Sequence, residues 1–138
     1  GVILFANVTY APTSRINLIV LDTLIQLAQL KPRPIKISNI LLERQKQLVK
    51  VITRWDQLTP IFAENFFEDY PIEDLKNSAD AIFKKMGNII QVNAMIPENQ
   101  LRGYCIIDCE KGKVRLAFTL TPENPALIQE YHLTIENN

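Results

Sequence analysis

The chain has 138 residues, the size of one domain, which is long enough to bury a core without disulfides or metals. Hydrophobic residues make up 47% of it and charged residues 22%, values that are ordinary for a globular protein rather than a disordered or fibrous one. The formal net charge is zero, which argues against a general nucleic-acid or membrane-surface binder. We therefore expect a single domain over residues 1–138 with no nucleic-acid partner.

The zero net charge conceals two segments of opposite sign. Residues 31–54 contain seven basic residues and one acidic residue, whereas residues 56–80 contain seven acidic residues and one basic residue. The simpler interpretation is that two neighbouring helices complement each other across their solvated faces. The alternative is that the basic segment forms a docking surface for a partner.

The N-terminal third begins with two apolar stretches. Residues 2–10 are rich in β-branched and aromatic residues, which predicts a strand, although the same stretch also resembles the end of a secretory signal. Thr13 or Ser14 can cap a helix that runs to about Leu30. Its apolar residues spread over more than one face, as in a helix that is central to a core or shared with another surface. This helix is too short and too polar to span a bilayer.

Three further helices are predicted before residue 88. Ser38 caps the first, which carries an apolar stripe against a basic outer face. Thr59 and Pro60 begin a short aromatic helix. Pro71 begins the last, which ends at Gly87 with lysines in its final turn. The apolar residues assigned to the short aromatic helix are Ile61, Phe62, Phe66 and Phe67.

After Gly87 the apolar residues alternate with a period of two, which is typical of strands. A first strand covers residues 89–96, a hairpin covers residues 103–121, and a last strand covers residues 127–135. The predicted fold is therefore α+β, with helices at about residues 14–87 packed on a four-stranded antiparallel meander at about residues 88–135. Residues 2–10 would add an N-terminal strand.

The hairpin allows its pairing to be predicted. If Lys111 and Gly112 form the turn, with glycine supplying a positive φ, then Asp108 lies opposite Arg115. A one-residue slip would destroy the division of the hairpin into an apolar and a mainly polar face, so the register is strongly specified. The apolar face carries Cys105, Ile107, Cys109, Val114, Leu116, Phe118 and Leu120.

No catalytic motif is complete in the chain. Ser14, Ser38 and Ser78 all lack a lysine three residues later, Gly-x-Ser-x-Gly is absent, and the four glycines form no phosphate-binding loop. Cys105 and Cys109 lie four residues apart on one strand, about 13 Å, so they cannot form a disulfide with each other. With His132 they would still lack a fourth zinc ligand. We therefore predict no catalytic residue, no metal and no cofactor.

A small set of aromatic residues and one carboxylate could line a ligand pocket between helices and sheet. For the aromatic residues the simpler interpretation is an aromatic core. For the carboxylate it is a cross-strand ion pair, although a carboxylate in an apolar cavity could act as a general base. The tentative pocket consists of Trp55, Phe66, Tyr70, Tyr104 and Asp108.

From about Trp55 onward, a series of short motifs resembles a known family. The series is similar to the small N-terminal domain that precedes the β-lactamase-like domain in serine hydrolases of the clavulanate-cluster type. That domain is a cone-shaped fold related to nuclear transport factor 2, ketosteroid isomerase and the cystatins. The motifs are Phe62-Ala63-Glu64-Asn65-Phe66-Phe67, Tyr70-Pro71-Ile72-Glu73-Asp74-Leu75, Met86-Gly87, Leu101-Arg102-Gly103-Tyr104, Lys111-Gly112 and Pro125-Ala126-Leu127-Ile128.

This resemblance implies an accessory domain, because the catalytic serine and lysine of such proteins belong to the domain that follows. The leading hypothesis is a non-catalytic domain of a bacterial hydrolase, contributing domain packing or ligand contacts. Its partner would be a C-terminal hydrolase domain of the same polypeptide, and its location would be exported or periplasmic. The alternatives are a stand-alone small-molecule binder or isomerase-like protein, and a homodimerisation module using residues 2–10 and 16–30.

Overall fold

A computed structural model describes residues 3, 5, 12–31, 34–55 and 60–136 of the chain. Internal contacts divide the chain into two compact units, Gly1–Pro34 and Ile35–Asn138. The first unit contains helix α1 (Thr13–Leu27), and the second contains all other helices and strands. The strand predicted for residues 2–10 lies almost wholly outside the described residues and stays a prediction.

Helix α1 forms where the sequence predicts it, but it is capped differently. Pro12 occupies the N-cap position and no side chain bonds the first turn, so the expectation of a Thr13 or Ser14 cap is wrong. No residue of α1 is buried, although many of its residues are apolar. Most of its aliphatic side chains are exposed, from Ile25 at 37% to Leu27 at 77%, and Leu21 is half-buried. The described residues of this unit therefore leave α1 without the full burial that an apolar helix gains in a core.

Helix α2 (Asn39–Thr53) begins at the predicted cap. The hydroxyl of Ser38 accepts a hydrogen bond from the N–H of Leu41 (3.4 Å) and donates one to the carbonyl of Gln100 (2.6 Å). The buried side of the helix follows its apolar stripe from Leu41 to Leu48 and Ile52. Among the described residues no salt bridge joins α2 to an acidic helix, so the expected mutual neutralisation of the two charged segments is not seen.

The short helix α3 (Phe66–Asp69) starts later than predicted. Phe62 instead pairs with Ile128 in a parallel bridge, in which Ala63 donates to the carbonyl of Ile128 and Ile128 donates to the carbonyl of Ile61. These bonds satisfy the backbone in an extended form, which competes with the helix. The proposed cap Thr59 lies outside the described residues.

Helix α4 (Ile72–Met86) follows the prediction closely. Glu73 and Asp74 lie in its first turn and two lysines in its last, as the helix dipole favours. Gly87 ends the helix with φ of +80°, and its N–H donates to the carbonyl of Phe83.

The sheet is antiparallel, with five strands in place of the predicted four. The strands are β1 (Ile89–Val92), β2 (Ile96–Pro97), β3 (Arg102–Cys109), β4 (Gly112–Leu120) and β5 (Ile128–Glu136). Their order in the sheet is β1-β3-β4-β5, and β2 pairs with β3 beyond the end of β1. The single first strand predicted for residues 89–96 is divided into β1 and β2, and Met95, between them, is buried in the core.

The β3–β4 hairpin has the predicted faces but not the predicted pairs. Glu110 and Lys111 form the turn, so the register differs by two residues and Asp108 lies opposite Lys113 rather than Arg115. A shift of two keeps every side chain on its face, and all seven residues of the predicted apolar face are buried. The carboxylate of Glu110 accepts hydrogen bonds from the backbone and side chain of Asn88, which fixes the turn.

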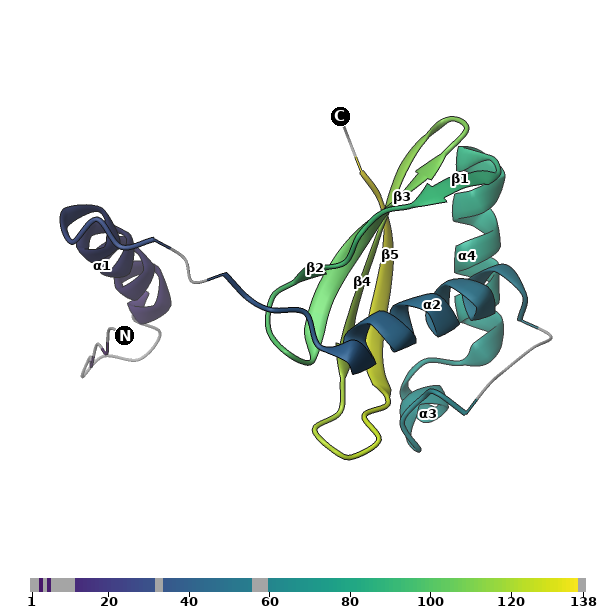
Figure 1. The fold of residues 1–138 in the computed structure, drawn as a ribbon, viewed down its shortest axis with the longest axis horizontal. Helices are drawn as coiled ribbons and strands as arrows, with labels where there is room; N and C mark the ends of the chain where they lie inside the picture. Colours follow the sequence, from purple (N-terminus) through teal and green to yellow (C-terminus); the bar gives the residue numbers. More distant parts are fainter. Residues whose placement is uncertain (1–2, 4, 6–11, 32–33, 56–59, 137–138) are drawn as a thin grey trace. The chain divides into compact units, whose positions relative to one another are not determined.

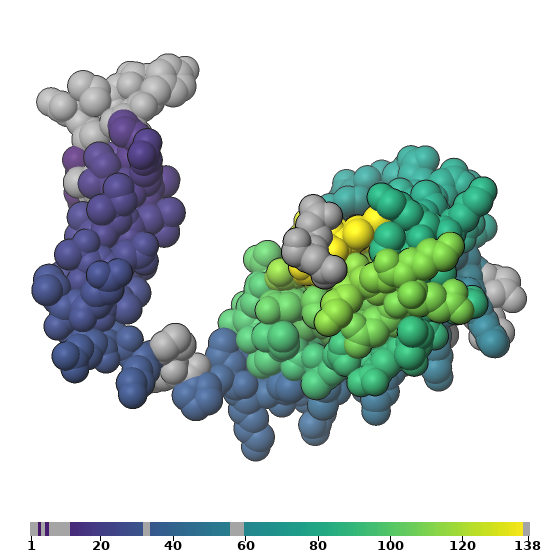
Figure 2. Space-filling view, turned by 90° about the horizontal axis from the view of Figure 1, so that it is seen from above, coloured from purple at the N-terminus to yellow at the C-terminus, as the bar shows by residue number. Residues whose placement is uncertain are grey.

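Helices α2, α3 and α4 gather on one side of the sheet (Figure 1). Their apolar residues and the inner face of β3, β4 and β5 form one core, so the α+β class is confirmed. The hairpin tip lies against the end of α4 (Figure 2), where Lys111 donates to the carbonyl of Met86. The opposite face of the sheet is left uncovered by these helices, and we call it the outer face.

Candidate functional site

The space between helices and sheet is filled by a cluster of aromatic rings. Phe66, only 2% exposed, lies at its centre, with the rings of Phe62, Phe67 and Tyr70 at 4.6, 5.2 and 5.2 Å. Tyr131 of β5 stacks on Phe66 at 6.0 Å. Two members of the predicted pocket, Phe66 and Tyr70, therefore belong to the core and its margin.

Trp55 and Tyr131 each bury a polar atom within this packing. The indole nitrogen of Trp55 and the hydroxyl of Tyr131 have no hydrogen-bond partner among the described residues. Burial raises the pKa of the Tyr131 hydroxyl, so it stays protonated at neutral pH. Trp55 itself is half-buried against the core at the end of α2.

Tyr104 and Asp108 lie on the other side of the sheet. They alternate along β3 with buried residues of the inner face, so their side chains belong to the outer face. The structure therefore does not bring the five predicted residues into one pocket. Trp55, Phe66 and Tyr70 are on the helix side, separated by the sheet from Tyr104 and Asp108.

The outer face centres on a stacked pair of side chains. The guanidinium carbon of Arg115 lies 3.7 Å from the ring centroid of Tyr104, a cation–π contact. Glu98 lies beside this pair, with one carboxylate oxygen 3.7 Å from Arg115 and the other 3.0 Å from Arg102. The carboxylate of Glu98 therefore contacts the guanidinium groups of both arginines, and Arg115 is held by Glu98 and by the ring of Tyr104.

Asp108 takes part in a separate polar contact. It accepts a hydrogen bond from the side-chain amide of Asn93 (2.8 Å), and its other oxygen lies 3.6 Å from the ammonium group of Lys113. The predicted ion pair with Arg115 is replaced by this pair with Lys113, as the observed register requires. Asp108 is thus satisfied by structural partners.

A shallow groove of about 430 Å³ crosses this face beside the stacked pair. Ile96 and Ile106 supply apolar surface, Tyr104 and Arg115 form one wall, and Lys113 and Glu136 supply opposite charges. No nucleophile lies beside a general base among the residues that line this groove. Their side chains are aromatic, cationic, carboxylate or aliphatic, so none of them activates another for covalent chemistry. The arrangement is suited to recognition rather than to covalent chemistry.

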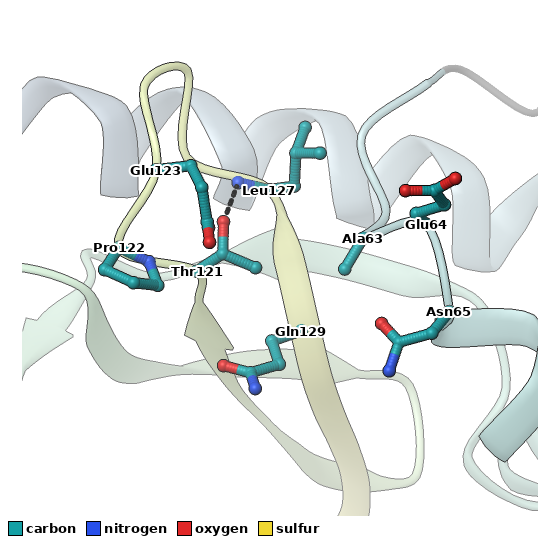
Figure 3. A pocket seen from close by; sticks show the side chains of 8 residues that line it. All are labelled: Ala63, Glu64, Asn65, Thr121, Pro122, Glu123, Leu127 and Gln129. Atoms are coloured by element: carbon teal, nitrogen blue, oxygen red, sulfur yellow. Dashed lines mark hydrogen bonds between the residues drawn. The ribbon is translucent and has the colours of Figure 1, made fainter.

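A second hollow of about 360 Å³ lies where the β4–β5 connection meets the start of α3. Figure 3 shows Glu123 pointing toward Thr121, whose hydroxyl oxygen accepts the N–H of Leu127 at 3.0 Å. Hydrogen bonding from the Thr121 hydroxyl lowers the pKa of Glu123. Asn65, directly before α3, and Gln129 of β5 add amide groups (Figure 3). Thr121 therefore bonds the loop to itself through Leu127 and Glu123, and no reactive pair is formed.

Other chemistry-bearing residues are placed singly. His132 lies on the outer side of β5 with only Glu130 at 2.8 Å, and Cys105 and Cys109 are free and buried. In the described part of the chain no three His, Cys, Asp or Glu side chains come together as metal ligands. Within the same residues no helix has the length and apolar character needed to cross a membrane.

Sequence reasoning missed Glu98, Asn93 and Arg44. Arg44 is buried on the apolar side of α2, where its Nε donates to the carbonyl of Ala126 at 2.8 Å. Its position three residues after Leu41 and four before Leu48 places it on the apolar stripe, so this residue could have been found from spacing. Glu98 could not be found in this way, because its partners are set by how β2 pairs with β3.

Comparisons of the chain with protein family models, curated proteins and solved structures gave no match.

Proposed function

We propose that the unit formed by residues 35–136 is a non-catalytic packing domain, which docks through the outer face of its sheet onto another domain. The partner that best suits the resemblance is the hydrolase domain of a bacterial β-lactamase-like serine enzyme in the same polypeptide. The stacked pair of Tyr104 and Arg115 is the observation that carries the proposal.

Tyrosine and arginine are the residue types that contribute most binding energy at protein interfaces. Here each is held in place before any partner arrives, because Arg115 lies over the ring and Glu98 fixes its guanidinium group. Preorganised side chains lose little conformational entropy on docking. Ile96, 46% exposed, and the half-buried Ile106 add apolar surface beside the pair.

The alternative of a small-molecule binder or isomerase-like enzyme has less support. Its pocket required Tyr104 and Asp108 beside Phe66, and these lie on opposite sides of the sheet. The interior that such a ligand would occupy is filled by packed rings around Phe66.

The first test is the coding sequence that follows Asn138. We expect it to continue into a domain with a Ser-x-x-Lys motif, and a stop codon directly after Asn138 would remove the proposed partner. In the full-length protein, Tyr104→Ala combined with Arg115→Ala should separate the unfolding of the two domains in calorimetry. Lys85→Ala, at an exposed position of α4 on the helix side of the sheet, is the control and should leave a coupled transition.

One observation favours self-association as a second function. Helix α1 buries none of its residues, yet it carries leucine, isoleucine and valine on most of its circumference. Such a helix gains stability when another surface covers it, and a second copy of α1 is one such surface. We therefore keep a homodimer formed through α1 as an alternative, and its test is given in the Discussion.

A further inference from the structure

Helix α2 and the end of β1 enclose an open groove of about 490 Å³ on the helix side of the sheet edge. Val49, Val92 and Ala94 give it an apolar floor, and Lys46 and Lys50 line its rim. The side-chain amide of Gln45 donates to the carbonyl of Asn93 at 3.1 Å. This bond ties α2 to the end of β1, so the width of the groove is fixed.

One wall of this groove is an open strand edge. Among the described strands, β1 lies at the end of the sheet order and pairs with β3 alone. The N–H of Asn93 donates to Ile106 of β3, so the preceding Val92 directs its own N–H and C=O toward the open side. Ile90, 69% exposed, and Val92, 36% exposed, add apolar side chains there. An edge of this kind is a template for an added strand.

The charge of the groove has one sign. Lys46 and Lys50 are exposed and lie one helical turn apart, and neither ammonium group has a salt-bridge partner among residues 12–31, 34–55 and 60–136. Their aliphatic stems extend the apolar surface, while their charged ends stay in water. Figure 2 shows long side chains of α2 projecting from the surface. A partner that fits must therefore be apolar at the floor and acidic at the rim.

We propose that this groove binds an extended peptide segment of alternating pattern, which adds to the edge of β1 and directs apolar and acidic side chains toward α2. Alternate residues of a strand are about 7 Å apart on one face. Residues one helical turn apart, such as Lys46 and Lys50, have Cβ atoms about 6 Å apart. Two carboxylates at alternate positions therefore match the two lysines, and flanking apolar side chains cover Val49 and Val92.

The probe is the synthetic peptide acetyl-Val-Thr-Glu-Thr-Glu-Thr-Val-amide, titrated into the isotopically labelled full chain to about 1 mM. Amide chemical shifts should change over residues 45–50 and 90–94 and leave α4 unchanged. Binding should weaken when salt is added, because the lysines are exposed. Absence of any shift, or shifts confined to other elements, would overturn the proposal.

Matched variants test the two lysines and the backbone pairing with β1 separately. Lys46→Glu with Lys50→Glu should weaken binding at least tenfold, whereas Lys84→Glu with Lys85→Glu on α4 should leave it unchanged. A peptide methylated on the backbone nitrogens that face β1 should also bind at least tenfold more weakly. Equal binding by the Lys46 and Lys50 variant, or by the methylated peptide, would contradict the proposal.

This inference does not depend on docking through the outer face. Tyr104→Ala with Arg115→Ala removes the stacked pair and should leave peptide binding unchanged, so each proposal can fail without the other. Circular dichroism of every variant distinguishes a lost site from a lost fold.

Discussion

Arg44 is a buried charged residue that holds the connection between β4 and β5. Its Nε donates to the carbonyl of Ala126, and its Nη1 donates to the side chain of Gln47 at 2.6 Å. Replacement by methionine keeps the aliphatic volume but leaves the buried carbonyl without a donor. We expect Arg44→Met to lower the free energy of unfolding in urea by about 2 kcal/mol. The exposed Lys50→Met should change it by less than about 0.5 kcal/mol, and equal effects would contradict this role.

We expect the two buried cysteines to make the free energy of unfolding fall at alkaline pH. Burial raises the pKa of both thiols above the ordinary value of 9.0, with the neighbouring carboxylates of Asp108 and Glu110 adding to the effect at Cys109. Above pH 9 the unfolded thiols ionise before the folded ones, so folding stability should fall as pH rises further.

A variant without thiols tests this dependence. Cys105→Ala with Cys109→Ala should show a shallower loss of unfolding free energy above pH 9 than the natural chain. Iodoacetamide at pH 8 should alkylate neither cysteine in the folded protein and both in urea. Rapid alkylation of the folded chain would show that the thiols are accessible and their pKa values are not raised.

At the scale of elements, two glycines on the hairpin differ in what surrounds them. A Cβ on Gly103 would lie 2.5 Å from the backbone carbonyl oxygen of Ile96, which cannot move without separating β2 from β3. A Cβ on Gly112 would lie 3.2 Å from the flexible sulfur of Met86, at φ of +154°.

The loss in free energy of unfolding should therefore differ between the two alanine variants. We expect Gly103→Ala to lower the free energy of unfolding by about 3 kcal/mol and Gly112→Ala by about 1 kcal/mol. Urea denaturation measures both, and hydrogen exchange should show lost protection in β2 for Gly103→Ala only. The reverse order would mean that the turn, rather than the β2–β3 contact, limits stability.

Helix α1 gives the second prediction for an element. If its apolar surface self-associates, sedimentation velocity of the full chain should show a concentration-dependent dimer. Leu24→Glu with Leu27→Glu should abolish the dimer, because charges would replace apolar contacts. Thr23→Glu with Gln26→Glu adds the same charge at polar positions and should preserve it. A monomer at every concentration would remove this alternative.

The hairpin shows which features of the fold could be predicted from the sequence and which could not. Alternation predicted which face each side chain of β3 and β4 occupies, because a slip of one residue would bury the polar set. It could not distinguish registers that differ by two, since both preserve the faces. The register depends on Glu110 bonding to Asn88 and on Met86 beside Gly112, contacts between segments far apart in the sequence.

The candidate site was harder to predict from the sequence than the fold, for the same reason. The alternation that buries Cys105 and Ile107 already put Tyr104 and Asp108 on the opposite face from Phe66, so grouping them in one pocket conflicted with the pattern. The partner of Arg115 depended on the register and on where β2 ends. Ile61 and Phe62 pair with Ile128 rather than forming a helix, because a strand far along the chain offers them backbone bonds.

At the scale of the whole molecule, the central claim is that the outer face of the sheet is covered by another domain in the natural protein. Hydroxyl-radical footprinting of the isolated chain and of the full-length natural product compares solvent access at Tyr104 and Ile106 directly. We expect both residues to be protected several-fold in the full-length protein, with the half-buried Tyr70 and Phe83 on the helix side of the sheet as references. Equal labelling of Tyr104 in the two proteins would contradict the account.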